Sequence, residues 1–480
     1  MRSSLRRSLL GALTLCAILP QAPAFAQSAP AADPARTRAE PPAAPAPRTS
    51  GPPNIVLILV DDFGVEGINA YGGEYYTPNV DRLAAQGTRF DNAHAMPLCS
   101  PSRVRLMTGQ ENWRNYEAFG YLAPGQRTFA NVLKEAGFTT GIVGKWQLMG
   151  NGFDGRTGIT PTAAGFDESY LWQLQALTPK GSRYWGPTRA ANGTPKISEE
   201  GFGPDNDQAF ALDFIARNQA TPFFLYYSMV LTHSPFVPTP DSLTATGAKN
   251  RFAGMVTYMD RQVGELMAAL KARGLDSNTL VIFTGDNGTA RQITTLRHGY
   301  PVRGGKGSPT VNGTHVPFIV AGPGVPSNRV SPALVDFADV LPTMAEAAGR
   351  PELAGKVDGV SQWNVFTGKA ARARDTIFQH YAPQWLFEPA RFVFDANWKL
   401  YGDGRFVSID AISGEETEVP PARRTGEAAK RFKVLSAELA AIKDGPLNPE
   451  RFPWCRTQAS SVPGKPAIEA GCEKGPSGDE

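Results

Sequence analysis

Five short apolar runs are spread along the chain, and polar residues follow four of them within a few positions. Runs of this length that contain β-branched residues predict strands buried on both faces, as in the centre of a parallel sheet. The runs cover residues 55–60, 139–143, 223–228, 280–284 and 316–321. They predict the strands of one large, mainly parallel sheet.

Stretches with the helical spacing of apolar residues lie between these runs. Residues 77–87 are one example, in which Thr77 suits the N-cap, Pro78 the first turn and Gly87 the end. Strands that alternate with helices predict an α/β fold, here a sheet flanked by helices. The other predicted helices cover about residues 128–135, 206–218 and 252–273.

The pattern changes after about residue 375. Residues 398–409 contain two candidate strands around a turn with two glycines, which predicts a β-hairpin. Residues 425–443 have the spacing of an amphipathic helix. We therefore expect a larger domain over residues 54–375 and a smaller C-terminal α+β domain with an antiparallel sheet over residues 376–480.

The N-terminus has the features of an export signal. Residues 1–26 combine a basic start, an apolar stretch and a small-x-small cleavage site at Ala24-Phe25-Ala26. The pair Arg6-Arg7 fits a twin-arginine signal, and an ordinary basic start explains it equally well. We expect a periplasmic or secreted protein. Residues 27–53, rich in Ala and Pro, are expected to form a disordered linker.

Composition narrows the class of partner. A formal net charge of +3 over 480 residues is too small to indicate a nucleic-acid partner. No apolar run after the N-terminus is long enough to span a membrane. Of the 4 cysteines, Cys16 leaves with the signal, and Cys455 and Cys472 are expected to pair in an exported protein. Cys99 has no partner, so it is either a small buried hydrophobe or a chemically used residue.

Polar residues lie where the predicted strands end. In open α/β sheets ligands bind at the carboxyl ends of the strands, so these residues are the candidate site. They are Asp61-Asp62, Gly144-Lys145-Trp146-Gln147, Thr232-His233, Gly285-Asp286-Asn287-Gly288 and Gly304-Gly305-Lys306-Gly307.

Four oxygen-bearing side chains among them suit a hard divalent cation. Asp61, Asp62, Asp286 and Asn287 offer oxygen ligands without a His or Cys cluster, which favours Ca²⁺ or Mg²⁺ over zinc. Each pair alone also fits a solvated strand end or a tight turn. Their joint position at the ends of apolar strands favours metal binding.

The run Cys99-Ser100-Pro101-Ser102-Arg103 predicts the start of a helix, with Ser100 as N-cap and Pro101 at the first helical position. Cys99 would then lie just before a helix N-terminus, which favours an anion. Arg103, Lys145 and Lys306 would add positive charge.

This run, with Thr108-Gly109 downstream and the strand-end motifs in their order, resembles the formylglycine-dependent type I sulfatase family of the alkaline phosphatase superfamily. The resemblance covers Asn54 to about Gly324. It implies an alkaline-phosphatase-like sheet and a formylglycine-generating enzyme that oxidises Cys99 to an aldehyde. It also implies that Asp61, Asp62, Asp286 and Asn287, with the side chain made from Cys99, bind the cation, usually calcium.

The resemblance further implies a role for each polar residue. The hydrated aldehyde attacks sulfur with one hydroxyl and expels sulfate by means of the other, and Arg103 stabilises this diol. Lys145 and Lys306 hold the sulfate oxygens, and His233 protonates the leaving oxygen, with Lys306 as a possible partner. The chain departs from the family at Gln147, where many members have a histidine that assists breakdown of the sulfated diol. Glutamine cannot accept a proton at neutral pH.

The predicted activity is hydrolysis of a sulfate monoester on a carbohydrate. The alternatives are a phosphonate monoester or phosphodiester hydrolase, a broad arylsulfatase, and an inactive member that binds sulfated glycans, which only Gln147 supports. The carbohydrate hypothesis comes from residues 151–205, expected to be a long, mostly irregular insertion whose aromatic and arginine side chains suit sugars and anions. A surface loop packed by its own aromatics explains them equally well. These side chains are Trp172, Arg183, Tyr184, Trp185 and Arg189.

Overall fold

A ten-stranded sheet is the largest element of the computed structural model, which describes residues 51–150, 156–172, 182–197, 200–384, 387–445 and 447. Its strands, in order across the sheet, are β12 (Arg329–Asp336), β2 (Thr88–His94), β11 (Phe318–Ala321), β8 (Thr279–Gly285), β1 (Asn54–Val60), β7 (Phe223–Ser228), β3 (Thr139–Lys145), β4 (Glu168–Trp172), β5 (Thr188–Ala191) and β6 (Thr194–Ile197).

The sheet is mixed, with a parallel centre. Strands β8, β1, β7, β3 and β4 are parallel neighbours. The run at 316–321 forms the shorter strand β11, which is antiparallel to both of its neighbours, and β5 and β6 are also antiparallel. The predicted α/β fold with a large, mainly parallel sheet is confirmed.

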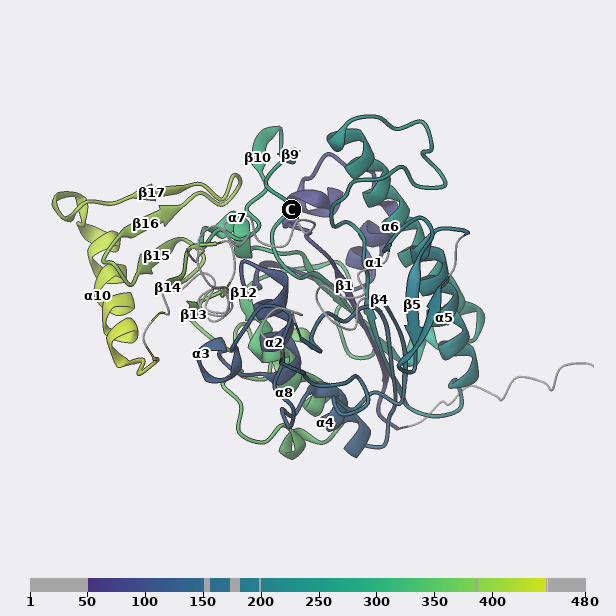
Figure 1. The fold of residues 1–480 in the computed structure, drawn as a ribbon. Coiled ribbons are helices and arrows are strands. Elements are labelled where there is room, and N and C mark those ends of the chain that lie inside the picture. The colour runs from purple at the N-terminus through teal and green to yellow at the C-terminus, as the bar shows by residue number, and fades with distance from the viewer. Residues whose placement is uncertain are drawn as a thin grey trace, which may run out of the picture. The chain divides into compact units, whose positions relative to one another are not determined.

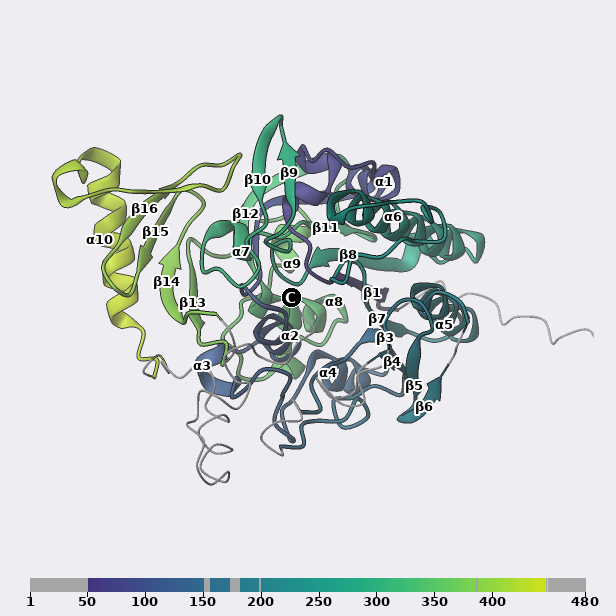
Figure 2. The same cartoon turned by 45° about the horizontal axis from the view of Figure 1, so that its top comes forward.

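Both faces of the sheet are covered by helices (Figures 1 and 2). Successive side chains of β1 enter two different cores, since strand side chains alternate between faces. Ile55 and Leu57 share one core with the helices α2 (Cys99–Thr108), α4 (Phe129–Glu135) and α8 (Val340–Ala347). Val56 and Ile58 share the other core with the helices α1 (Pro78–Gln86), α5 (Gly203–Arg217) and α6 (Ala248–Ala272).

The predicted helices match these bounds to within a few residues, but the start of α2 was wrong. The helix begins at Cys99, and Leu98 is the extended residue before it. Ser100 lies inside the first turn, where its hydroxyl accepts a hydrogen bond from the Gly120 amide (3.0 Å) instead of capping the helix. Cys99 therefore belongs to the first turn rather than preceding it.

The insertion predicted to be mostly irregular also needs correction. Its described residues contain β4, β5 and β6, which extend the main sheet, and α5 begins inside it at Gly203. These strands are only four or five residues long, so their pattern is weak in the sequence. Strand β4 pairs with β3 and brings Trp172 opposite Lys145.

The C-terminal region forms a second, antiparallel sheet that includes the predicted hairpin (Figure 1). One of its faces packs on α10 (Gly426–Ala441) through Leu435, and the other shares a core with Met96, Leu98 and Cys99. The boundary at residue 375 stays a prediction. The strands are β13 (Ile377–Tyr381), β14 (Ala390–Phe394), β15 (Trp398–Tyr401), β16 (Phe406–Ile409) and β17 (Glu416–Glu418).

The remaining described elements are short. They are the hairpin β9 (Thr294–Arg297) and β10 (Tyr300–Arg303), the helices α3 (Asn112–Asn115), α7 (Val311–Thr314) and α9 (Trp363–Phe366), and 3-10 turns at Val65–Gly67, Asn69–Tyr71, Asp276–Asn278, Phe337–Asp339, Pro351–Ala354 and Pro421–Arg423. None of the helices in the described ranges combines the length and apolarity needed to cross a membrane. The predicted signal, most of the linker and the pair Cys455 and Cys472 lie outside the described residues.

Candidate active site

The polar residues predicted at the strand ends meet at one edge of the main sheet. Strands β8, β1, β7 and β3 are parallel neighbours, so their carboxyl ends lie side by side. Asp61 follows β1, Asp286 follows β8, Lys145 ends β3 and His233 lies beyond β7. All four side chains are buried.

The turn after β1, which contains Asp61 and Asp62, is hydrogen-bonded to Asp286 at the end of β8. Asp62 has a left-handed backbone (φ 59°), which turns the chain at the strand end. The Asp62 amide donates to Asp286 Oδ1 (2.9 Å), and the Asp286 amide donates to the Val60 carbonyl (2.9 Å). The backbone therefore fixes the distance between the Asp61-Asp62 pair after β1 and Asp286 after β8.

The four oxygen-bearing side chains fit a cation. Ligand atoms of Asp61, Cys99 and Asp286 lie within 4.8 Å of one another, as do those of Asp61, Asp62 and His233. Asn287 Nδ2 donates to Asp62 Oδ1 (2.8 Å), while Asn287 Oδ1 is buried and accepts no hydrogen bond from the described part of the chain. An unsatisfied buried amide oxygen beside three carboxylates is what a hard cation with oxygen ligands would use.

Two basic side chains, Lys145 and Arg103, hold the acidic side chains of Asp61 and Asp286 in place. Lys145 Nζ lies 3.0 Å from each carboxylate oxygen of Asp61. Arg103 Nη2 lies 2.8 Å from Asp286 Oδ2. Burial opposes ionisation of Asp61, but Lys145 and Arg103 keep the pKa of its carboxyl below the usual range. Burial and the neighbouring Asp61 raise the pKa of Asp286.

Ser228 at the end of β7 ties these groups together, although the sequence pattern did not single it out. Its hydroxyl accepts a hydrogen bond from Arg103 Nη1 and donates one to the Lys145 carbonyl (2.7 Å). Its only signal in the sequence is its place as the last residue of a predicted strand.

Lys306 and His233 form a hydrogen-bonded pair. Lys306 Nζ lies 2.8 Å from Asp62 Oδ2 and 3.0 Å from His233 Nε2. His233 Nδ1 lies 2.6 Å from the Ser234 carbonyl, which only accepts, so Nδ1 carries the hydrogen and Nε2 accepts from Lys306. Burial, with Arg183 and Lys306, lowers the pKa of His233 well below its usual value. The histidine is therefore neutral.

Cys99 lies at the start of α2, and its sulfur is within 4.8 Å of carboxylate oxygens of Asp61 and Asp286. It is a free, buried cysteine. Burial raises the pKa of its thiol to about 11, although Lys145 opposes this. Because the thiolate is the nucleophilic form, the unmodified side chain is a weak nucleophile at neutral pH.

Two of the aromatic and arginine residues reach the site. The Arg183 guanidinium stacks on Trp172 (4.1 Å), with Nη1 4.0 Å from Asp61 Oδ2. The Tyr184 hydroxyl donates to the His233 carbonyl (2.5 Å). Arg189 instead forms a buried pair with Asp207 (2.6 and 2.8 Å). Trp185 is 40% exposed and donates to the Pro238 carbonyl (2.8 Å).

Gln147 is buried two residues beyond Lys145, with a left-handed backbone (φ 55°). This backbone conformation turns the chain as it leaves β3.

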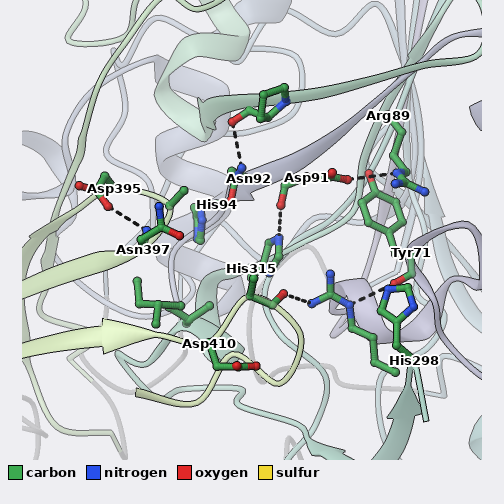
Figure 3. A pocket seen from close by; sticks show the side chains of 16 residues that line it. Tyr71, Arg89, Asp91, Asn92, His94, His298, His315, Asp395, Asn397 and Asp410 are labelled. Atoms are coloured by element: carbon green, nitrogen blue, oxygen red, sulfur yellow. Dashed lines mark hydrogen bonds and ion pairs between the residues drawn. The ribbon is translucent and has the colours of Figure 1, made fainter. Parts of the chain in front are cut away.

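A cavity of about 390 Å³ lies elsewhere, lined by residues of β2, the β9–β10 hairpin and the C-terminal sheet (Figure 3). It contains three histidines with no assigned role, His94, His298 and His315. Burial lowers the pKa of His94 and His315, so both are neutral. The cavity is lined by none of the predicted site residues.

Comparisons with known proteins identify the family. The family model named Sulfatase matches residues 53–350, more than half of the chain. An N-acetylgalactosamine-6-O-sulfatase of Bacteroides thetaiotaomicron is 31% identical over 414 residues, covering 69% of this chain and 80% of the relative. Arylsulfatase A of Homo sapiens is 33% identical over 360 residues, covering 68% and 70%.

A solved structure from work on glycosaminoglycan metabolism by Bacteroides thetaiotaomicron superposes with a TM-score of 0.62 and 25% identity. The match covers 82% of this chain and 100% of that one. The chain belongs to the sulfatase family and is a sulfuric ester hydrolase.

Proposed function

We propose that the chain hydrolyses a sulfate monoester of a carbohydrate with a nucleophile made from Cys99. The observation that carries this proposal is the position of Cys99, whose sulfur lies within 4.8 Å of carboxylate oxygens of both Asp61 and Asp286. Lys145 and Lys306, each paired with one of the acidic residues, add positive charge to the same site. A buried thiol would be a poor nucleophile here, whereas its hydrated aldehyde, formylglycine, offers two hydroxyls.

Asp61, Asp62, Asp286 and Asn287 would hold the divalent cation, Ca²⁺ or Mg²⁺. When bound, the cation supplies positive charge that stabilises an ionised hydroxyl and the developing charge on sulfate. Arg103 keeps Asp286 oriented and stabilises the diol. A formylglycine-generating enzyme is the maturation partner that this chemistry requires.

In the first step one hydroxyl of the diol, ionised with its proton released to solvent, attacks sulfur and the S–O bond to the alcohol breaks. Lys145 and Lys306 hold the nonbridging sulfate oxygens. The leaving oxygen takes a proton from the Lys306–His233 pair, whose shared hydrogen lies on Lys306 in the resting state.

In the second step the other hydroxyl loses its proton, the C–O bond to sulfate breaks and the aldehyde returns. Gln147 can orient the diol by hydrogen bonding but cannot accept this proton, since an amide stays neutral near pH 7. We infer that the Lys306–His233 pair, which gives up a proton in the first step, accepts this one and so returns to its resting state.

The carbohydrate assignment is supported by the names of the relatives and by Arg183. A sulfatase with 31% identity acts, by its name, on N-acetylgalactosamine 6-O-sulfate groups. Arg183 adds a buried cation beside Asp61, and Trp185 offers an exposed aromatic face two residues later. We also propose export to the periplasm or the medium through a signal over residues 1–26.

Three measurements test this function. Mass spectrometry of the peptide around Cys99 from natively produced protein is expected to show the aldehyde, and a thiol in every molecule would reject the mechanism. A panel of sulfated monosaccharides, with a matched aryl sulfate and aryl phosphonate, is expected to rank a sugar sulfate first. Faster cleavage of the phosphonate would favour phosphonate hydrolysis instead. Unchanged activity of Arg183→Ala and Trp185→Ala on every sugar would remove the carbohydrate assignment.

A further inference from the structure

The loop after Lys306 is held by the C-terminal sheet. Lys399 Nζ on β15 donates a hydrogen bond to the Pro309 carbonyl. Glu416 on β17 accepts one from the Val311 amide through Oε1 (2.9 Å). Asn312 Nδ2 donates to the Ser413 carbonyl (3.0 Å). Pro309, Val311 and Asn312 of the loop are therefore each held by a polar group that lies about 100 residues away in sequence.

The groups that hold the loop form a buried network of their own. Lys399 Nζ lies 3.1 Å from Glu416 Oε1 and 3.9 Å from the centre of the Phe392 ring. The Tyr401 hydroxyl donates to Glu416 Oε2 (2.5 Å). The side chains of Lys399, Glu416 and Tyr401 are nearly inaccessible to solvent. Burying an ion pair costs desolvation energy, so such a pair is weak evidence for stability alone.

Both ends of the held loop lie next to residues of the candidate active site. Lys306 stands immediately before it and contacts Asp62 and His233. At the other end, the Gly288 amide donates to the Gly313 carbonyl (2.9 Å), next to Asn287. A Cβ on Gly288 would lie 1.9 Å from the Asn312 carbonyl oxygen, so the two segments are in tight contact. A shift of the loop would therefore displace Lys306 and press on the backbone beside Asn287.

We propose that Glu416 and Lys399 are positioning residues for Lys306, and that the C-terminal sheet thereby takes part in catalysis by fixing the loop over residues 307–313. The inference rests on the proposed role of Lys306. Glu416 acts at the centre, because its two oxygens join the loop amide, Lys399 and Tyr401.

A double-mutant cycle tests this inference. The four proteins are the wild type, Glu416→Gln, Lys306→Ala and the double variant, assayed for kcat/KM on an aryl sulfate well below their melting temperatures. Glu416→Gln keeps the shape of the side chain and is expected to lower kcat/KM by about 10- to 100-fold, as loss of a supporting partner does around other sites. In the Lys306→Ala background the same change is expected to have less than about a twofold effect, since its target is gone.

Asp444→Asn is the matched control. Asp444 is a buried carboxylate of the same region, bonded to His380 (2.6 Å) and Arg391 (2.8 Å), but contacts no residue of the loop in the described structure. It is expected to lower the melting temperature and to keep kcat/KM. If Glu416→Gln does not fold, Tyr401→Phe removes only the hydroxyl that donates to Glu416 and enters the same cycle.

Each outcome decides the inference. A Glu416→Gln effect that persists in full without Lys306, or a lowered melting temperature with unchanged kcat/KM, overturns it and leaves the proposed function intact. Full activity of Lys306→Ala overturns the role assigned to Lys306 and the inference with it.

Discussion

Helix α2 carries two buried arginines, Arg103 and Arg105, that face two differently built charge clusters. Arg103 points to what we name the catalytic cluster, made of Asp61, Asp62, Asp286, Asn287, Lys145 and Lys306. Arg105 points to the Arg105 cluster, made of Glu111, Asp336, Asp339 and Arg374. Two arginines separated by one position on the same helix thus form ion pairs in two different charge clusters.

The Arg105 cluster satisfies its own charges. Arg105 forms a fork with Asp336 (2.6 Å from Nε and from Nη2) and a second pair with Glu111. Asp336 and Asp339 also accept backbone amides in a capping box, and Asp339 is paired with Arg374. A buried carboxylate with this many donors needs no further ligand.

In the catalytic cluster, by contrast, a polar atom is left without a hydrogen-bond partner among the described residues. Three carboxylates crowd one strand edge, and Asn287 Oδ1 is left without a hydrogen bond from the described residues. A raised carboxyl pKa does not separate the two clusters, because burial raises the pKa of Glu111 as it does that of Asp286. Among the described residues, three His, Cys, Asp or Glu ligand atoms come within 4.8 Å of one another in the catalytic cluster and not in the Arg105 cluster. The comparison therefore points to convergence of ligand atoms, rather than burial of charge alone, as the mark of the candidate site.

Replacing Cys99 with alanine is expected to have the largest effect. Cys99→Ala removes the proposed source of the nucleophile, so kcat/KM should fall by about 10⁴-fold or more. The fold should persist, because the side chain is small and the change leaves the ion pairs of both clusters in place. Assays of sulfate release and thermal melting check this. More than one per cent of wild-type activity in Cys99→Ala would contradict the nucleophile assignment.

Changing the two arginines one at a time separates the clusters. Arg105→Met leaves buried Asp336 without its fork, so the free energy of unfolding should fall by about 3–5 kcal/mol. Its kcat/KM at low temperature should stay within about threefold of the wild type. Arg103→Met should lower kcat/KM by about 100-fold or more, as loss of a preorganised donor does. Denaturant unfolding and steady-state kinetics on both variants measure these effects. Equal losses of activity in the two variants would contradict the assignment of different roles to the two clusters.

Removal of the cation should affect one cluster only. A chelator is expected to lower activity by about 100-fold, with recovery on addition of Ca²⁺ or Mg²⁺. At 100 times its dissociation constant the cation should also stabilise the fold by about 2.7 kcal/mol. Asp286→Asn should lose this gain in melting temperature, whereas Arg105→Met should keep it. Full activity after exhaustive chelation would argue against a metal site.

The smallest expected effect concerns Lys399 and pH. Burial lowers the pKa of Lys399 to about 8, while an unfolded lysine titrates near 10.4. Between these values the unfolded chain binds more protons, so stability rises with pH through this window. The difference in unfolding free energy between wild type and Lys399→Met should therefore shift by about 2 kcal/mol in favour of the wild type from pH 7.5 to 10. Urea titrations at several pH values measure it, and a flat difference would contradict the lowered pKa.

Much of the fold could be predicted from the sequence because its central strands are continuous apolar runs. Those at 55–60 and 280–284 became neighbouring strands with the acidic residues directly beyond them. The strands of the 151–205 segment were missed, since strands of four or five residues carry a weak pattern. The start of α2 was misplaced because Ser100 and Pro101 fit the first turn as well as the cap.

The sequence by itself determined which residue types stand at the strand ends and that Cys99 lies within a sulfatase-like run. Those are local properties, set by composition and spacing. Only the tertiary structure decided that Arg103 meets Asp286 while Arg105 meets Asp336, that Arg183 rather than Arg189 reaches Asp61, and that Glu416 holds the loop of Lys306. These contacts join segments that are far apart in the chain, so they depend on how strands and helices pack rather than on any local pattern.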